Sequence, residues 1–276
     1  MPAPKLEPKI EPRSDPRVEK VPGTRPEGVR DEREAAARVQ QMFSRIAPRY
    51  DFLNHLLSFS LDRVWRWRTA KRFLPILGRA DARILDICCG TGDLAFALDR
   101  ARRSALGAPQ VAQRSPVIGS DFVEPMLERA REKAANGSRA TVFAAADALN
   151  LPFPDASFDL VTTAFGFRNL ANYEHGLREI ARVLKRGGEV GILEFTEPGS
   201  GPLAGILRFY LRHILPRIGG AISGNSEAYA YLPGSVAKFP APRELAALME
   251  KTGFADVRIS SWNFGGVILH TARRAR

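Results

Sequence analysis

A pair of glycines flanked by carboxylates is the part of the sequence best suited to hold a charged ligand. The segment Asp86–Asp93 reads DICCGTGD and follows a short apolar run. Its Gly90 and Gly92 allow the backbone to turn sharply and to approach a ligand closely. Together with Ala95 they also match the dinucleotide pattern G-x-G-x-x-G/A, whose loop receives a pyrophosphate at a helix N-terminus. The two flanking aspartates make this loop negative, which favours the sulfonium and ammonium groups of S-adenosylmethionine over a nicotinamide dinucleotide.

Carboxylates follow the next two apolar runs as well. Asp121 ends the second run, where a carboxylate can accept hydrogen bonds from both ribose hydroxyls of an adenosine. It lies about 30 residues beyond the glycine loop rather than roughly 20, and we attribute the excess to a polar insertion at 103–115, predicted to be a loop. Asp147 and Ala148 follow the third run, where a carboxylate and a backbone N–H can contact adenine. A turn or helix cap is the structural alternative for Asp147.

Alternating strands and helices must position these residues. Short apolar runs predict strands, and the amphipathic stretches between them predict helices. The predicted strands are 83–88, 117–120, 141–145, 158–164 and 189–195, and the predicted helices are 94–102, 125–134 and 172–184, the last stopped by Gly187–Gly188. This alternation indicates an α/β fold with a doubly wound, mostly parallel sheet, helices on both faces and ligands at the carboxyl ends of the strands. A helix at 242–251 and a hairpin of 257–261 with 267–270 follow, so the last strand is expected to be antiparallel.

The chain ahead of the first strand divides into two parts. Residues 1–30 hold seven prolines among charges of both signs, which predicts a disordered tail over 1–32 and a folded domain over 33–276. Two amphipathic helices are predicted next, one that ends at Pro48 and one at 62–73. Cys88 and Cys89 are too few for a disulfide framework or a metal site of their own, so we expect two small buried residues.

The composition of the chain limits which binding partners and which cellular compartment are expected. The net charge of +11 suits anionic lipid as well as an ordinary basic surface, and no RNA-binding signature is present, so no nucleic-acid partner is expected. The sequence has neither a run of about 18 uncharged apolar residues nor a signal-peptide pattern, so we expect a cytoplasmic protein. The apolar segment 203–218 carries interspersed arginines and predicts either contact with an anionic membrane or an ordinary core helix. A homo-oligomer stays open.

Several longer stretches resemble the ubiquinone/menaquinone biosynthesis C-methyltransferase family. The stretches similar to its signatures are Met42–Arg66, Leu151–Leu170 and Arg182–Pro198, and further similar stretches are Tyr231–Pro240 and Gly265–His270. The resemblance extends from about Glu34 to Ala272. It departs from the family pattern at Asp62 in place of His, at Arg186 in place of Pro, and at Ala164 in place of a frequent Ser.

The resemblance implies a seven-stranded class I methyltransferase fold, which is Rossmann-like. It implies that S-adenosylmethionine is bound by Gly90, Thr91, Asp121, Asp147 and Ala148. It also implies a polyprenylated quinol as the methyl acceptor, and the CCGTGD loop favours demethylmenaquinol over the benzoquinol of the ubiquinone pathway. The segments 33–75 and 199–240 are then expected to form helical cover on the substrate side, at the inner face of the membrane.

Methylation of an aromatic carbon needs a ring activated by loss of a hydroxyl proton, and no metal is required. Arg168 is expected to favour the phenolate, because a nearby cation lowers the pKa of an acid, and Asn169 is expected to orient the same oxygen. A salt bridge is the alternative for Arg168. Tyr50, Asn54 and Tyr231 are expected to line the quinol pocket. His55 is a further candidate for this pocket, and a structural role is its alternative.

Three rival functions remain open on the sequence. One is methylation of another small acceptor, which would not need the Met42–Arg66 segment. The second is a non-catalytic cofactor-binding subunit of an assembly, and the third is a nicotinamide oxidoreductase.

Overall fold

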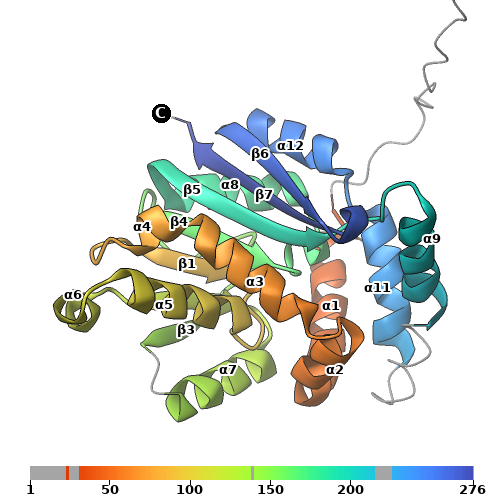
Figure 1. The fold of residues 1–276 in the computed structure, drawn as a ribbon, viewed down its shortest axis with the longest axis horizontal. Coiled ribbons are helices and arrows are strands. Elements are labelled where there is room, and N and C mark those ends of the chain that lie inside the picture. Colours follow the sequence, from red (N-terminus) through yellow and green to blue (C-terminus); the bar gives the residue numbers. More distant parts are fainter. Residues whose placement is uncertain (1–22, 25–30, 138–139, 215–225, 276) are drawn as a thin grey trace, which may run out of the picture.

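The computed structural model describes residues 23–24, 31–137, 140–214 and 226–275, and its centre is one twisted seven-stranded sheet. The strand order is β3-β2-β1-β4-β5-β7-β6 (Figure 1). All neighbours from β3 to β5 are parallel, and β7 is antiparallel to both β5 and β6. The strands are β1 Ile84–Ile87, β2 Val117–Asp121, β3 Thr141–Ala145, β4 Phe158–Ala164, β5 Leu184–Phe195, β6 Phe254–Trp262 and β7 Val267–Arg274. The predicted mixed sheet with an antiparallel last strand is confirmed.

Helices cover both faces of the sheet because the central strands are apolar on both sides. All four residues of β1 are buried, as expected of a parallel strand between two helical layers. On one face the core joins the sheet to α3 Leu61–Arg72, α4 Leu74–Leu77 and α5 Asp93–Ala105. On the other face it joins the sheet to α8 Tyr173–Val183 and α12 Pro242–Lys251.

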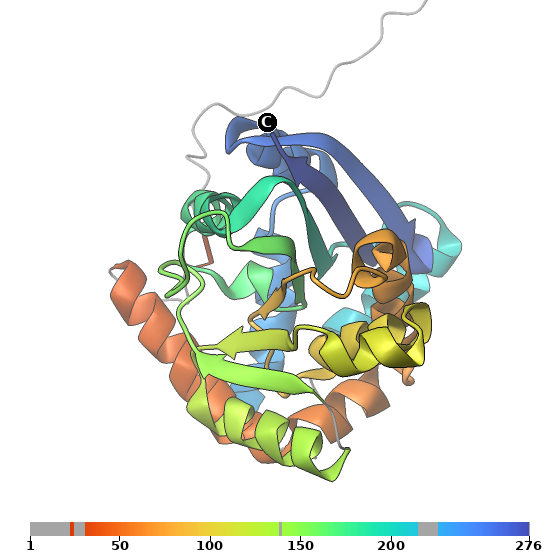
Figure 2. The same ribbon diagram turned by 90° about the vertical axis from the view of Figure 1, so that its left-hand side faces the viewer.

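A second group of helices lies across the carboxyl ends of the parallel strands, at the right of Figure 1. It comprises α1 Glu32–Ile46, η1 Ala47–Arg49, α2 Tyr50–Leu57, α9 Pro202–Phe209, a π-helical turn Tyr210–Ile214 and α11 Ser226–Lys238. Helix α1 begins at the Asp31 cap, whose side chain accepts a hydrogen bond from Glu34 N at 2.9 Å. It then runs beside α7 Glu124–Asn136 (Figure 2). These helices lie where the sequence predicted ligand-binding residues.

Three local predictions were wrong. The expected loop at 103–115 is largely helical, because α5 continues to Ala105, with Arg103 paired to Asp99 one turn earlier, and α6 spans Ala108–Gln113. The helix predicted to reach 184 ends at Val183, because buried Leu184 adopts an extended backbone and pairs with Phe158 of β4. The glycine pair 187–188 therefore lies inside β5.

The predicted tail of residues 1–32 lies mostly outside the described residues. Within the described part, Thr24 is buried and its backbone N–H donates to Leu170 O at 2.9 Å, so this position packs against the domain. Helix α1 begins at Glu32. Of the apolar segment 203–218, the structure describes α9 and the π-helical turn, and 215–218 lies outside the described residues.

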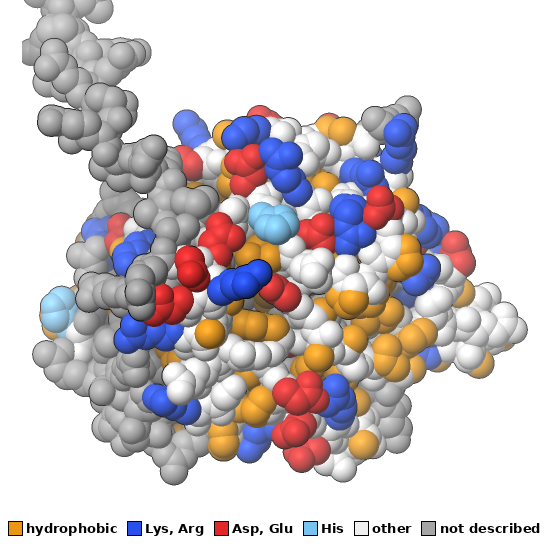
Figure 3. Space-filling view, turned by 180° about the vertical axis from the view of Figure 1, so that it is seen from behind, with side chains coloured by type: hydrophobic (Ala, Val, Ile, Leu, Met, Phe, Trp, Pro, Cys, Tyr) orange, Lys and Arg blue, Asp and Glu red, His pale blue; other side chains and the backbone are white. Residues whose placement is uncertain are grey.

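The surface distributes its charges unevenly. Acidic and basic side chains are intermixed on the face opposite to Figure 1 (Figure 3). On α3, by contrast, the exposed polar side chains are basic: Arg63, Arg68, Lys71 and Arg72. Among the helices that the structure describes, none is both long and apolar enough to cross a membrane.

Candidate active site

A small cavity of about 80 Å³ lies at the carboxyl ends of β1, β2, β3 and β4. It is the place where an open α/β sheet binds its ligand. Every residue predicted to hold the cofactor lines this cavity: Gly90, Thr91, Asp121, Asp147 and Ala148. Asn169, predicted to act on the acceptor, lines it as well.

Asp121 is fixed by backbone amides at the end of β2. One carboxylate oxygen accepts from Gly90 N at 2.8 Å and the other from Val123 N at 2.9 Å. Burial raises the pKa of Asp121, and these backbone hydrogen bonds act against that effect. Each oxygen retains a further lone pair, so the carboxylate can accept two ribose hydroxyls as the sequence suggested. Asp147 accepts from Leu149 N at 2.9 Å, which is the turn that the structural alternative predicted, and still borders the cavity.

The two aspartates that flank the glycines have different environments. Asp86 is 1% exposed, its Oδ1 accepts from Thr162 at 2.7 Å, and its Oδ2 has no hydrogen-bond partner. Burial raises the pKa of Asp86 to about 7. Asp93 instead contacts Lys133 at 2.6 Å and Arg66 at 3.6 Å, and although burial raises its pKa, these cations lower it overall. Cations therefore already pair with Asp93, whereas Asp86 borders the cavity with an unpaired oxygen and a pKa that leaves it partly protonated near pH 7.

Close backbone contacts shape the wall of the small cavity. Cys88, directly after β1, has a left-handed backbone with φ of 49°. A Cβ placed on Gly166 would come within 2.4 Å of the Cβ of Cys88, so only glycine fits there. Cys88 and Cys89 are partly rather than wholly shielded from solvent, and both border the cavity. Burial raises the pKa of both thiols well above the ordinary value, which keeps them protonated.

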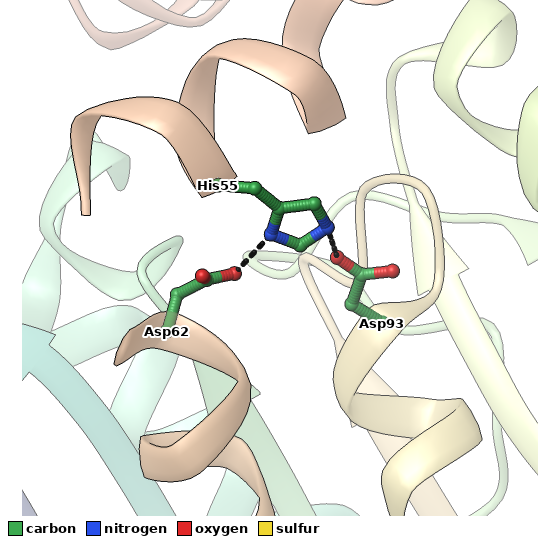
Figure 4. A group of neighbouring side chains, drawn as sticks. All are labelled: His55, Asp62 and Asp93. Carbon is green, nitrogen blue, oxygen red and sulfur yellow. Dashed lines mark hydrogen bonds and ion pairs between the residues drawn. The ribbon is translucent and has the colours of Figure 1, made fainter. Parts of the chain in front are cut away.

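A polar network attaches the N-terminal helices to the cofactor loop. His55 of α2 points its Nδ1 at Asp62 of α3 at 2.8 Å and its Nε2 at Asp93 of α5 at 4.0 Å (Figure 4). One histidine and two carboxylates resemble a metal donor set, but Arg66 already bonds to Asp62 and lies near Asp93. Asp62, where the family pattern has His, is thus the partner of a buried cation. This supports the structural alternative for His55.

A second part of this network joins α2 to α7. Lys133 Nζ of α7 lies 2.9 Å from Asp51 of α2 and 3.1 Å from the Thr91 hydroxyl. Thr91 Oγ1 in turn donates to Asp51 at 2.5 Å. The apolar side chains of Ala36, Val39 and Phe43 from α1 also border the small cavity. We call these side chains, together with the contacts of Lys133, Asp51 and Thr91, the roof of the cavity.

A larger cavity of about 500 Å³ lies beneath the second group of helices and is mainly apolar. The predicted acceptor residues Tyr50, Asn54, Tyr231 and Arg168 all line it. Burial raises the pKa of Tyr50, and it raises that of Tyr231 to about 12. The two cavities meet, because four residues line both of them: Phe43, Tyr50, Arg66 and Phe165.

Arg168 and Asn169 lie in the short η2 turn Phe167–Asn169 after β4, at the junction of the cavities. Arg168 is 5% exposed and its Nη1 contacts Glu194 of β5 at 2.6 Å, so the salt bridge considered as its alternative exists, but it is buried rather than on the surface. Although burial lowers the pKa of Arg168, the Glu194 carboxylate raises it overall, so the guanidinium stays charged. Asn169 Oδ1 accepts from the Tyr231 hydroxyl at 3.2 Å, which fixes the amide.

Comparison with known proteins shows which family this site belongs to. The model of the ubiE/COQ5 methyltransferase family matches residues 30–274. The chain belongs to this family. A member of the ubiE/COQ5 methyltransferase family uses S-adenosylmethionine as its methyl donor, so this protein is an S-adenosylmethionine-dependent C-methyltransferase rather than an oxidoreductase.

Its relatives cover nearly the whole domain. The demethylmenaquinone methyltransferase of Deinococcus radiodurans is 48% identical over 86% of this chain and 92% of its own length. That of Thermus thermophilus is also 48% identical, over 84% of this chain and all of its own length. The ubiquinone/menaquinone biosynthesis C-methyltransferase UbiE of Geobacter sulfurreducens is 43% identical over 87% and 90%. A methyltransferase structure from Thermotoga maritima shares the fold, with a TM-score of 0.58 at 19% identity over 85% of this chain and 99% of its own.

The sequence reasoning missed the residues that complete the site from other elements. Asp51 and Lys133 hold the roof, Arg66 stands between the cavities, and Glu194 pairs with Arg168. Glu194 lies within one of the stretches similar to the family signatures, and this was the available signal for it. Nothing comparable marked Lys133, which resembles the other exposed charges of an amphipathic helix.

Proposed function

We propose that this methyltransferase converts demethylmenaquinol to menaquinol by C-methylation of the quinol ring. The observation that carries the proposal is the apolar cavity of about 500 Å³ that meets the glycine-loop cavity at Tyr50, Arg66 and Phe165. A cavity of this size lies within the usual range for sites that bury a ligand of tens of atoms. Two relatives that are 48% identical are named demethylmenaquinone methyltransferases. The benzoquinol of the ubiquinone pathway is the second candidate, because other relatives are named for both pathways.

The residues of the small cavity fit S-adenosylmethionine. Asp121 has lone pairs for the ribose, Asp86 offers an unpaired buried oxygen to a cationic group, and Gly90 and Gly166 allow the backbone to approach. When bound there, the cofactor supplies an electrophilic methyl group. The surrounding roof excludes water from the junction of the cavities.

Arg168 and Asn169 activate the acceptor in this proposal. The quinol hydroxyl must lose its proton to make the ring carbon nucleophilic, and a charged guanidinium beside it lowers the pKa of the hydroxyl. The Nε of Arg168 is buried without a hydrogen-bond partner, so it can donate to that oxygen. Asn169 is fixed by Tyr231 through its Oδ1, which leaves its amide N–H groups to orient the same oxygen. Tyr50 and Asn54 border the ring.

A membrane surface completes the proposal, because the isoprenoid tail of the substrate resides in a bilayer. Several large apolar side chains are exposed and also line the larger cavity: Phe59, Leu61, Leu203, Ile206 and Phe264. Phe59 is 75% exposed and Ile206 66%. We call these five side chains the rim. The basic side chains of α3 follow Leu61 of the rim in the sequence. Cations beside an apolar surface favour binding to anionic lipid. We propose that this rim lies on the inner face of the membrane and that the tail enters the cavity between its side chains.

Two experiments test these assignments. Labelled methyl transfer from S-adenosylmethionine is measured with demethylmenaquinol and, in parallel, with the benzoquinol. Label in menaquinol supports the proposal, label only in the benzoquinol transfers the enzyme to the ubiquinone pathway, and label in neither rejects a quinol acceptor. Arg168→Ala is expected to lower kcat, and an unchanged kcat would remove Arg168 from the chemistry.

The membrane proposal is tested by sedimentation with vesicles. The unmodified protein is expected to bind vesicles containing anionic lipid at low salt, and a Phe59→Ser/Ile206→Ser variant is expected to bind them at least about tenfold more weakly. A matched control is Val142→Ser, which changes an exposed apolar residue of β3 away from the rim. Equal binding by all three proteins would rule out this surface.

A further inference from the structure

Glu194 contacts Arg168 at two points and accepts a third hydrogen bond from its own neighbour, Phe195. Its Oε1 accepts from Arg168 Nη1 at 2.6 Å and from Phe195 N at 2.9 Å, and its Oε2 accepts from Arg168 N at 3.1 Å. The carboxylate is 1% exposed and the guanidinium pairs with it away from solvent. Arg168 Nη1 also donates to Phe165 O at 2.5 Å, so Nη1 is engaged by two acceptors, whereas Nε is buried without a hydrogen-bond partner. Glu194 thus determines both the backbone of the η2 turn and the direction in which the guanidinium points.

The charge of Glu194 matters as much as its geometry. The junction of the cavities is bordered by two buried guanidinium groups, Arg66 and Arg168, and the cofactor of this family carries a positive sulfonium. Uncompensated cations in such a low-dielectric place repel one another strongly. Arg66 has Asp62 and Asp93 as partners, whereas Glu194 is the one carboxylate within salt-bridge distance of Arg168 among the described residues.

We propose that Glu194 is a positioning residue with two effects, which rest on the role proposed above for Arg168. It aims the free Nε edge of Arg168 at the acceptor oxygen, and it cancels the charge of Arg168 so that a sulfonium can bind nearby. Arg168 then favours the phenolate at hydrogen-bond distance, where its own charge acts directly, while the Arg168–Glu194 pair as a whole is neutral toward the sulfonium. This explains how a cationic activating group and a cationic methyl donor occupy adjoining cavities.

The test compares two ligands that differ in the charge of one sulfur. S-Adenosylmethionine carries a positive sulfur and S-adenosylhomocysteine a neutral one, and calorimetry at pH 8 gives the ratio of their affinities. Glu194→Gln removes the carboxylate charge but keeps the shape, and it is expected to weaken S-adenosylmethionine at least about tenfold more than S-adenosylhomocysteine, the equivalent of one pKa unit of interaction. The matched control is Glu189→Gln, on the same strand, whose partner is the exposed Arg273.

A second variant keeps the test decisive if Glu194→Gln does not fold, since an unpaired buried charge is strongly destabilising. Arg168→Gln leaves the carboxylate and removes the cation, so the affinity ratio is expected to move in the opposite direction. Equal changes for both ligands in these variants would reduce Glu194 to a structural ion pair and overturn the inference. The affinity ratio is measured without any quinol, so it tests the role of Glu194 independently of the acceptor. The methyl-transfer assay of the unmodified enzyme tests the acceptor assignment.

Discussion

Asp86→Asn is expected to make the cofactor-free protein more stable at pH 8 and to weaken cofactor binding. Burial raises the pKa of Asp86 to about 7, whereas an aspartate in an unfolded chain titrates near roughly 3.9. Between these values the native state binds more protons than the unfolded state, so the free energy of unfolding falls as the pH rises through this window and levels off above it. The gap of about 3 pKa units corresponds to about 4 kcal/mol above pH 7. Asparagine has the same shape and does not ionise, so it avoids this cost.

Thermal unfolding at pH 5 and pH 8 measures the effect. Most of the cost arises between these two values, about 2 pKa units or about 3 kcal/mol. We compare the Tm of the variant minus the Tm of the unmodified protein at each pH. For a chain of this length, this difference should be roughly 6–12 °C larger at pH 8 than at pH 5. The comparison cancels the other titrating groups, which both proteins share. The same Tm difference at both pH values would refute the reasoning.

Cofactor affinity should respond in the opposite sense. A cationic ligand favours the ionised form of Asp86, so the affinity of the unmodified protein for S-adenosylmethionine is expected to rise up to about pH 7 and then to level off. The asparagine variant should bind more weakly above pH 7 and should lack this rise. Calorimetry at several pH values checks both points, and parallel pH profiles for the two proteins would show that the ligand does not contact Asp86.

Two further changes test the walls of the small cavity. Asp121→Asn places an amide NH₂ against the backbone N–H of Gly90 or Val123 and removes a charged acceptor, so S-adenosylmethionine should bind about tenfold or more weakly in calorimetry; an unchanged Kd would dismiss its contact with the ribose. Lys133→Met removes the partly exposed link from α7 to Asp51, which should accelerate cofactor dissociation up to about fivefold in stopped-flow measurements. Identical dissociation rates would mean that this link does not hold the roof.

The sheet, and the gathering of the predicted cofactor residues around one cavity, could be predicted because their signals are local. The glycine loop, Asp121 and Asp147 each follow an apolar run directly, and the carboxyl ends of parallel strands meet at one edge. The end of α8 could not be predicted from the glycines at 187–188, because the pairing of Leu184 with Phe158, 26 positions away, decided it. Helix propensity and turn signals are overridden wherever such tertiary contacts are stronger.

The contacts that complete the site could not be predicted from the sequence, because they also join residues that lie far apart in it. Lys133 contacts Asp51 across 82 positions of sequence, and Arg168 contacts Glu194 across 26. A charged residue on an amphipathic helix or at the end of a strand looks the same in sequence whether it faces water or a buried partner. The sequence singled out Arg168 and allowed for a salt bridge on the surface, but it did not reveal the buried partner Glu194.

The placement of the first helices also bears on how the protein is made. Helices α1 to α3 precede every strand, yet Gln40 donates to Phe122 O at 2.6 Å, and the Trp65 indole donates to Asn263 near the carboxyl end at 3.0 Å. A chain emerging from the ribosome presents these helices first and their partners last, and contacts between such distant positions form late. The central sheet can therefore assemble around the glycine loop while the walls of the larger cavity are still incomplete. The wall of the larger cavity is complete only after the chain has been made as far as Val267.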